Sequence, residues 1–132
     1  MMRHDSGKPN RLSDPAVPVD VFRVPMALGA NREGVDQGAT TLDNALRRRL
    51  ETRGYTQILG RLQPSVDIPV TPLGPDRGDE PNAWYANEIA AACATLAGGV
   101  AETVGAGRFA LLLGGDHALS VGSLAGAGVA GR

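Results

Sequence analysis

The stretch Phe109-Ala-Leu-Leu-Leu-Gly-Gly-Asp-His117 decides the fold expected for this chain. Its first five residues, 109–113, are apolar without polar alternation, which is typical of a strand covered on both faces. Gly114 and Gly115 follow, and two glycines let the chain bend sharply and let other backbone come close. The stretch therefore predicts a buried strand that ends in a tight turn.

Asp116 and His117 come directly after this predicted strand. Open α/β sheets place their chemistry just beyond the carboxyl ends of strands, so both are candidate site residues. The neutral imidazole of His117 can offer a ring nitrogen to a divalent metal ion. Asp116 can orient that ring, ligate the metal or cap the next helix. On residue types alone, a structural histidine is the favoured alternative.

A long helix is predicted before the strand, over residues 83–104. Apolar residues recur there at the helical period; they are Tyr85, Ile89, Cys93, Leu96, Val100 and Val104. Gly98 and Gly99 within the helix each cost about 1 kcal/mol relative to alanine, which close packing against a neighbour would offset. Cys93 is the only cysteine of the chain. Its place on the apolar face indicates a buried small side chain rather than a reactive thiol.

The amino-terminal part begins with a predicted strand over residues 19–28, whose interior Pro25 weakens. The loop 29–38 contains Gly29, Gly34 and Gly38, which supply tight turns. A strand followed by such a loop is the first half of a strand–helix unit.

A second helix is predicted after this loop, ending near Arg53. Thr40 or Thr41 is expected to cap its start, and Asp43 in the first turn suits the positive end of the helix dipole. One face carries an apolar stripe that is expected to cover the sheet, formed by Leu42, Ala45, Leu46 and Leu50. The basic run 47–49 indicates a solvated face of this helix.

Residues 55–72 give weaker signals. Ile58-Leu59 and 68–70 have β-like composition, but Pro64, Pro69 and Pro72 favour a short edge strand and an extended loop. Residues 73–82 are predicted to form an exposed loop. A last helical segment is expected to begin at Ser120 or Ser123.

The predicted elements alternate between strand and helix, which indicates an α/β fold with a parallel sheet and right-handed crossovers. Strand 109–113 is expected to lie in the centre of that sheet. Three strands make an incomplete sheet with an exposed edge, so further strands are expected in the intact protein. The predicted division is a flexible leader over residues 1–18 and part of one α/β domain over residues 19–132.

Composition narrows the class of protein. The chain has 132 residues, and 13 Lys and Arg against 14 Asp and Glu give a net charge of −1. This balance offers no electrostatic footprint for nucleic acid or an anionic membrane. No apolar stretch approaches the about 20 residues that span a bilayer, and residues 1–18 lack an apolar signal core. A single cysteine fits a reducing compartment, so a cytoplasmic location is expected.

Two segments carry a family resemblance. Residues 107–123 closely resemble the first metal motif of the arginase family of ureohydrolases, usually Gly-Gly-Asp-His-Ser. The loop 29–38 and its helix are similar to the segment after the family's first strand. The helix with Asn87-Glu88 that leads into Gly107-Arg-Phe is similar to that of bacterial arginases. The resemblance covers residues 21–126 in the right order.

The resemblance implies a three-layer α/β/α fold and hydrolysis of L-arginine to L-ornithine and urea. It also implies two manganese ions that bridge a hydroxide, with His117 as a ligand of one ion and Asp116 as a supporting residue. The implied partners are a small guanidino substrate and identical subunits in a trimer or hexamer.

This sequence departs from the family pattern at several places. Ala118 stands where Ser is common, and Ala39 stands where Pro is usual. The family's later Asp-x-His-x-Asp and Ser-x-Asp-x-Asp motifs, which supply most metal ligands, do not occur here. The expectation is that this chain is a fragment with an incomplete site and is inactive alone.

Two alternatives stay open. The chain resembles an agmatinase or another ureohydrolase less closely than an arginase, and it also suits a non-catalytic binding or assembly module. For the loop residues Asn31, Arg32, Glu33 and Asp36, the alternatives are a pocket mouth, a subunit contact through Arg32, or an ordinary surface turn; the surface turn is favoured.

Overall fold

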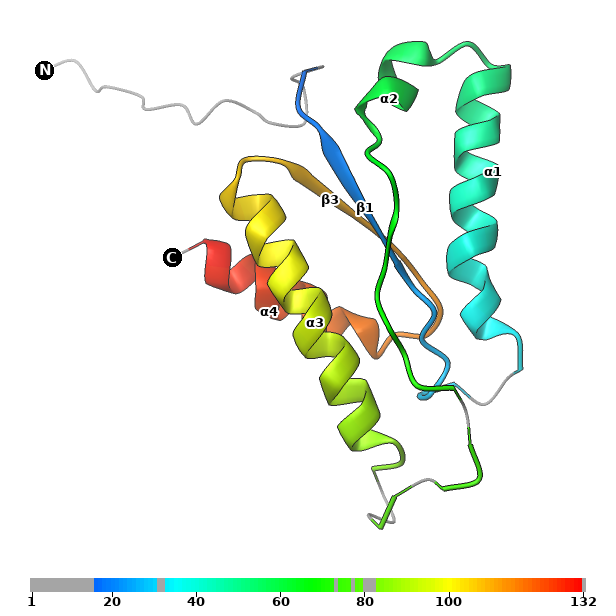
Figure 1. Cartoon of the computed structure of the whole chain (residues 1–132), viewed down its shortest axis with the longest axis vertical. Helices are drawn as coiled ribbons and strands as arrows, with labels where there is room; N and C mark the ends of the chain where they lie inside the picture. The colour runs from blue at the N-terminus through cyan, green and yellow to red at the C-terminus, as the bar shows by residue number, and fades with distance from the viewer. Residues whose placement is uncertain (1–15, 31–32, 73, 77, 80–82, 132) are drawn as a thin grey trace, which may run out of the picture.

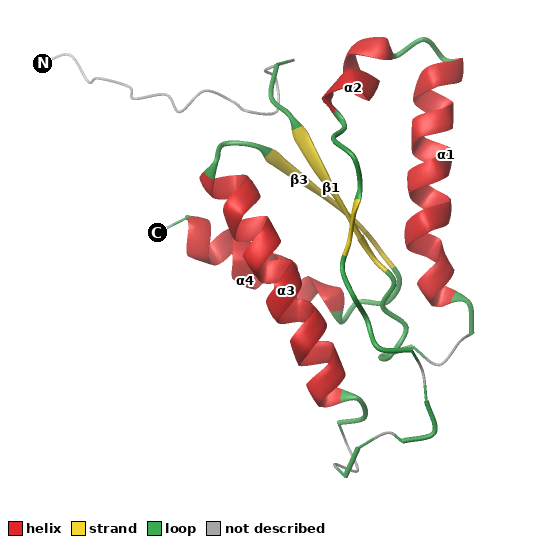
Figure 2. Cartoon of the chain, in the orientation of Figure 1, coloured by secondary structure: helices red, strands yellow, loops and turns green. Residues whose placement is uncertain are grey.

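The computed structural model describes residues 16–30, 33–72, 74–76, 78–79 and 83–131. Strands and helices alternate along these residues (Figure 2). In chain order they are β1 (Val19–Val24), the 3-10 helix η1 (Val35–Gln37), α1 (Gly38–Thr52), α2 (Thr56–Arg61), β2 (Val66–Asp67), α3 (Ala86–Gly105), β3 (Phe109–Gly114) and α4 (Leu119–Ala130).

The three strands form one parallel sheet in the order β2-β1-β3. Helix α1 lies on one side of the sheet, and α3 and α4 lie on the other (Figure 1). The expected three-layer α/β/α arrangement around a parallel sheet, present in part, is therefore confirmed. The leader predicted over residues 1–18 falls largely on residues 1–15, which lie outside the described residues.

Within the described residues, the strand order differs from the expected one. Strand β1, and not β3, occupies the middle, with Val19 opposite Phe109 and Val24 opposite Gly114. In the described part of the chain, β3 pairs with β1 alone and forms an edge. The physical reason is that the crossovers from β1 to β2 and from β2 to β3 place the two later strands on opposite sides of β1. Burial agrees, because Val21 and Val24 of β1 have no exposed surface.

The main core lies between the sheet and α3. The helix presents Cys93, Leu96 and Val100 to the apolar residues of β1 and of the segment that follows it. Leu96 and Met26 are completely buried. The predicted apolar face of α3 is thus confirmed, as is the burial of the Cys93 thiol.

Helix α1 differs from its prediction in start and orientation. It begins at Gly38, and no side chain caps it, so the capping role given to Thr40 or Thr41 is wrong. Its buried residues are Ala39, Asp43 and Leu50, whereas Leu42 of the predicted stripe is 53% exposed. The helix is turned because the carboxylate of Asp43 has polar partners beneath it, on β1 and on the segment before β2.

The region after α1 is also partly corrected. Ile58 and Leu59 lie in α2 rather than in a strand. The predicted short edge strand is present, and it consists of Val66 and Asp67. The strand pairs with β1 through these two residues. Pro64 and Pro69 lie on either side of it, and they limit its length because proline has no backbone N–H to donate.

The two adjacent glycines of α3 have different surroundings. An added Cβ at Gly99 would lie 2.7 Å from Cε1 of Phe22, whereas one at Gly98 would meet nothing within 4 Å. The close packing expected to offset these glycines is therefore present at Gly99 alone.

This difference gives a stability prediction. Gly99→Ala is expected to lower the free energy of unfolding by about 1–2 kcal/mol because the Phe22 ring must shift. Gly98→Ala, the matched control, is expected to raise it by up to about 1 kcal/mol through helix propensity. Urea denaturation of both variants measures the difference, and equal effects would contradict the packing seen at Gly99.

Helix α4 contains no charged residue and packs against α3. Its first helical residue is Leu119, just before the predicted starts at Ser120 and Ser123. An added Cβ at Gly122 would lie 2.6 Å from the Cys93 carbonyl oxygen, and one at Gly126 would lie 2.5 Å from that of Ala97. The two glycines thus allow the helix backbones to meet. No described helix has the length and apolar character needed to cross a membrane.

Candidate functional site at the carboxyl ends of β1 and β3

The candidate site lies where the chain reverses its direction of winding. From β1 the chain moves to β2 on one side, and it then returns to place β3 on the other side. Ligands of open α/β sheets bind in the crevice outside the carboxyl ends of two such strands. Here the position of the predicted crevice is flanked by the described residues of the segment after β1, 25–30 and 33–37, and by the turn after β3, residues 115–118.

The Asp116 side chain joins these two segments. Its Oδ2 accepts a hydrogen bond from the backbone N–H of Gly29 at 2.8 Å. Its Oδ1 accepts one from the backbone N–H of Ala118, also at 2.8 Å. The Asp116 backbone N–H donates to the Met26 carbonyl at 2.9 Å. Among the roles considered for Asp116, the observed contacts are those of a carboxylate that organises backbone.

Gly115 makes this approach possible. An added Cβ there would lie 2.0 Å from the Met26 carbonyl oxygen and 2.9 Å from that of Val35. Only glycine leaves room for backbone at such distances. The close approach predicted for the glycine pair after β3 is therefore confirmed.

The His117 side chain is exposed at the start of the turn into α4. Its carbonyl accepts hydrogen bonds from the backbone N–H of Ser120 at 3.0 Å and from the Ser120 hydroxyl at 2.7 Å. No described residue forms a hydrogen bond or ion pair with the imidazole. Within the described residues, the ring therefore has none of the contacts that a structural histidine would make.

The donor atoms present do not suffice for two manganese ions. No group of three or more His, Cys, Asp or Glu side chains within the described residues could hold a metal ion. Both Asp116 oxygens already accept backbone hydrogen bonds. One imidazole does not meet the need of hard divalent cations for several oxygen ligands. The described residues alone therefore do not fit the metal centre that the sequence resemblance implies.

Comparison with known proteins decides the family. The family model described as "Arginase family" matches residues 17–131. This chain belongs to the arginase family. The match runs through both segments that form the crevice, and it includes Asp116 and His117.

Individual arginases resemble this family member over most of its length. The arginase of Brevibacillus brevis is 38% identical over 109 residues, which cover 82% of this chain and 35% of the relative. Human arginase-1 is 35% identical over 112 residues, which cover 82% of this chain and 32% of the relative. The chain thus spans about a third of the length of the relatives that it matches.

Solved structures support the same assignment. The native structure of Bacillus caldovelox arginase at pH 5.6 gives a TM-score of 0.65 with 35% identity. It covers 83% of this chain and 36% of the solved chain. A Bacillus subtilis arginase structure gives a TM-score of 0.63 with 30% identity over 83% of this chain and 34% of the solved chain. The arginase-family chain therefore has the corresponding part of the arginase fold.

The loop residues considered as pocket candidates fall into two groups. Asn31 and Arg32 lie outside the described residues. Glu33 and Asp36 are exposed. Asp36 borders a small pocket of about 190 Å³ beside the crevice, together with Pro25, Ala27, Leu28, Val70, Thr71 and Pro72. Asp36 therefore has a place at the mouth of this pocket.

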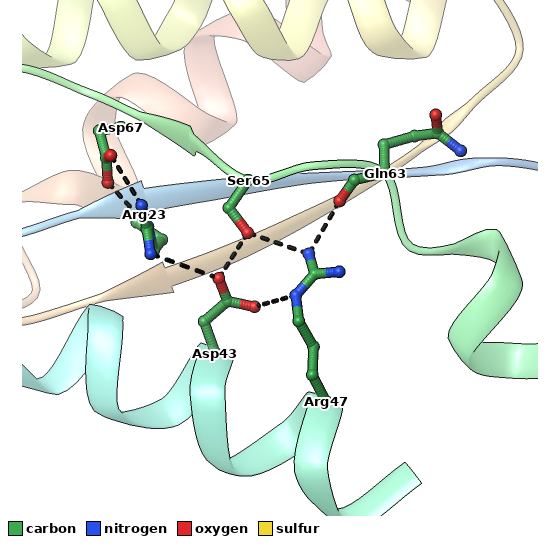
Figure 3. Close-up of polar contacts among 6 residues, drawn as sticks. All are labelled: Arg23, Asp43, Arg47, Gln63, Ser65 and Asp67. Atoms are coloured by element: carbon green, nitrogen blue, oxygen red, sulfur yellow. Dashed lines mark hydrogen bonds and ion pairs between the residues drawn. The ribbon is translucent and has the colours of Figure 1, made fainter. Parts of the chain in front are cut away.

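An ion-pair network around the buried carboxylate of Asp43 links α1 to the sheet, and it was not predicted from the sequence (Figure 3). The Asp43 carboxylate accepts hydrogen bonds from Nε of Arg47, at 2.8 Å, and from the Ser65 hydroxyl. Arg47 Nη2 also donates to the Gln63 carbonyl at 2.8 Å. The solvated face predicted for run 47–49 is therefore wrong for Arg47, because its guanidinium fills a polar site beneath the helix.

Arg23 extends this network along β1 to β2. Its Nε and Nη2 atoms each lie 2.7 Å from an oxygen of Asp67, and its Nη1 lies 3.7 Å from Oδ2 of Asp43. Hydrogen bonding to Asp67 raises the pKa of Arg23 despite the opposing effect of burial. Burial by itself raises the pKa of Asp43. The hydrogen bonds from Ser65 and Arg47 and the charges of both arginines outweigh burial and leave that pKa below its ordinary value.

Proposed function

We propose that the protein to which this chain belongs hydrolyses L-arginine to L-ornithine and urea. The single observation that supports this activity most directly is the position of His117. Its imidazole is exposed at the crevice of a chain whose relatives are arginases at 33–38% identity. Agmatinase or another ureohydrolase activity is the alternative within the same chemistry.

The proposed role of this chain is to supply part of the site. His117 is proposed as one ligand of a manganese centre, and Asp116 is proposed as its supporting residue. The remaining ligands would come from polypeptide other than the described residues, because these residues do not suffice. A cytoplasmic location and assembly of the complete protein into trimers or hexamers belong to the same proposal.

A urea assay and manganese titration of this chain test its contribution. The chain is expected to bind Mn²⁺ weakly and to release no urea from arginine, since one imidazole is a poor site for a hard cation. Histidine-ring NMR signals provide the readout, because paramagnetic Mn²⁺ broadens the signals of a bound ring. The chain has two histidines, so His4 is an internal control for His117.

His117→Ala is the matched variant for this titration. Loss of Mn²⁺ binding in this variant would support the proposed ligand. Equal Mn²⁺ binding by both proteins would remove His117 from the proposed site. Appreciable urea release by the unmodified chain would show that the ligand set of the described residues is larger than the structure indicates.

A non-catalytic assembly role is the second candidate, and the open edge of β3 favours it. Helix α4 exposes Val121, Leu124 and Val129, each at least 65% exposed, and Leu124 lines a pocket together with Phe109 and Leu112 of β3. A strand edge next to apolar surface suits pairing with another chain. Size-exclusion chromatography with a complete arginase is the test, and a stable monomer beside the unchanged arginase would exclude docking.

A further inference from the structure

We propose that Asp116 is a positioning residue that locks the segment after β1 to the turn after β3 and thereby fixes the backbone of His117. This inference rests on the proposed function for the importance of His117, but the lock itself requires neither metal nor substrate. In this proposal, Asp116 holds two backbone segments together and neither ligates a metal nor orients the imidazole.

Three hydrogen bonds make the lock. The carboxylate accepts one from Gly29, which is 87 residues away in the chain, and one from Ala118 within its own turn. The Asp116 N–H closes the connection by donating to Met26. Hydrogen bonds to an ionised carboxylate are about twice as strong as neutral ones, so a single charged side chain holds both segments together.

The surrounding backbone is shaped for this contact. Gly115 brings the turn against the Met26 carbonyl, at a separation that no side chain would allow. An added Cβ at Gly29 would lie 3.3 Å from Oδ2 of Asp116. A side chain at position 115 would hold the segments apart, and one at position 29 would crowd the Asp116 carboxylate.

The lock fixes His117 from the amino-terminal side, and α4 fixes it from the carboxyl-terminal side. The two Ser120 bonds to the His117 carbonyl hold the next turn. With its backbone held at both ends and its ring exposed, His117 projects from a rigid position. Such preorganisation is what a metal ligand needs from its support.

Amide hydrogen exchange of the metal-free chain tests the lock. Gly29 and Ala118 lie outside the helices and strands, yet their amides are expected to be protected in the unmodified chain. Asp116→Asn places an NH₂ group against one of the two backbone donors. The amides of Gly29 and Ala118 are then expected to exchange about 10- to 100-fold faster. The backbone order parameter of His117 is expected to fall from about 0.85 toward 0.6.

Two controls make the result specific. The amides of Gln63 and Phe109, which bond to Val19 and Pro18 at the opposite end of the sheet, are expected to keep their exchange rates. Asp36→Asn changes an exposed aspartate near the same crevice and is expected to leave Gly29 and Ala118 protected.

Three outcomes would overturn the lock. These are unprotected Gly29 and Ala118 amides in the unmodified chain, unchanged exchange in Asp116→Asn, and equal acceleration of every sheet amide. The first needs no variant, so a failure of Asp116→Asn to fold does not prevent a decision. Equal Mn²⁺ binding by the unmodified chain and by His117→Ala would count against the proposed function and leave the lock intact.

Discussion

Gly122→Ala is expected to lower the free energy of unfolding by about 3 kcal/mol, at the upper end of the range for overpacking. The added Cβ would lie 2.6 Å from the Cys93 carbonyl oxygen and 2.9 Å from its Cα. Both atoms belong to the α3 backbone, which cannot move away as a single side chain can. Relief therefore requires α4 to separate from α3, with loss of the packing between the two helices.

Chemical denaturation measures this effect, and α4 offers its own control. An added Cβ at Gly128 would meet nothing within 4 Å. Gly128→Ala is therefore expected to stabilise the chain by up to about 1 kcal/mol, because alanine favours the helix more than glycine does. If Gly122→Ala were as stable as Gly128→Ala, the close contact between α3 and α4 would not exist in solution.

Asp43→Asn is expected to destabilise the chain by about 2–3 kcal/mol at pH 7. The substitution leaves the charges of Arg23 and Arg47 facing a neutral group. Breaking a buried ion pair by removing one partner costs about 3–5 kcal/mol. The expected value is smaller because the side chains of Arg23 and Arg47 keep 22% and 28% of their exposure. Glu51→Gln, on the exposed part of the same helix, is the control and is expected to have little effect.

The pH dependence of this difference gives an independent measurement. The pKa of Asp43 is lowered in the folded chain, whereas the pKa of an aspartate in the unfolded chain is about 3.9. The stabilisation is fully present above about pH 4 and is lost as pH falls through the lowered folded pKa. Denaturation curves from pH 7 to pH 2 should therefore converge for the unmodified chain and Asp43→Asn. A difference that stays constant over this range would show that the Asp43 charge does not contribute.

The sequence alone predicted the features that depend on local periodicity and glycine. The apolar run 109–113 and the spacing of apolar residues in 83–104 predicted β3 and α3, because burial requires one side-chain pattern for a strand and another for a helix. The Gly114-Gly115 pair predicted the tight turn that presents Asp116 and His117. The family, too, could be anticipated from these short segments.

Features that depend on distant partners could not be predicted in the same way. The sequence predicted Asp43 in the first turn of its helix, where a carboxylate interacts favourably with the helix dipole. In the structure α1 begins at Gly38 and has no acidic residue in its first turn. Arg47 is a local partner on the same helix, but Arg23 and Ser65 lie 20 and 22 positions away in the sequence. The orientation of α1 follows from these contacts, which is why the predicted stripe through Leu42 was wrong.

The sequence by itself determined an α/β chain with a histidine at the carboxyl end of a strand, since side-chain period and backbone freedom are local properties. Only the tertiary structure decided that β1 lies in the middle of the sheet and that Asp116 reaches Gly29. Both facts depend on how the crossovers bring separate segments together. A hydrogen bond across 87 residues exists only when the whole sheet has formed.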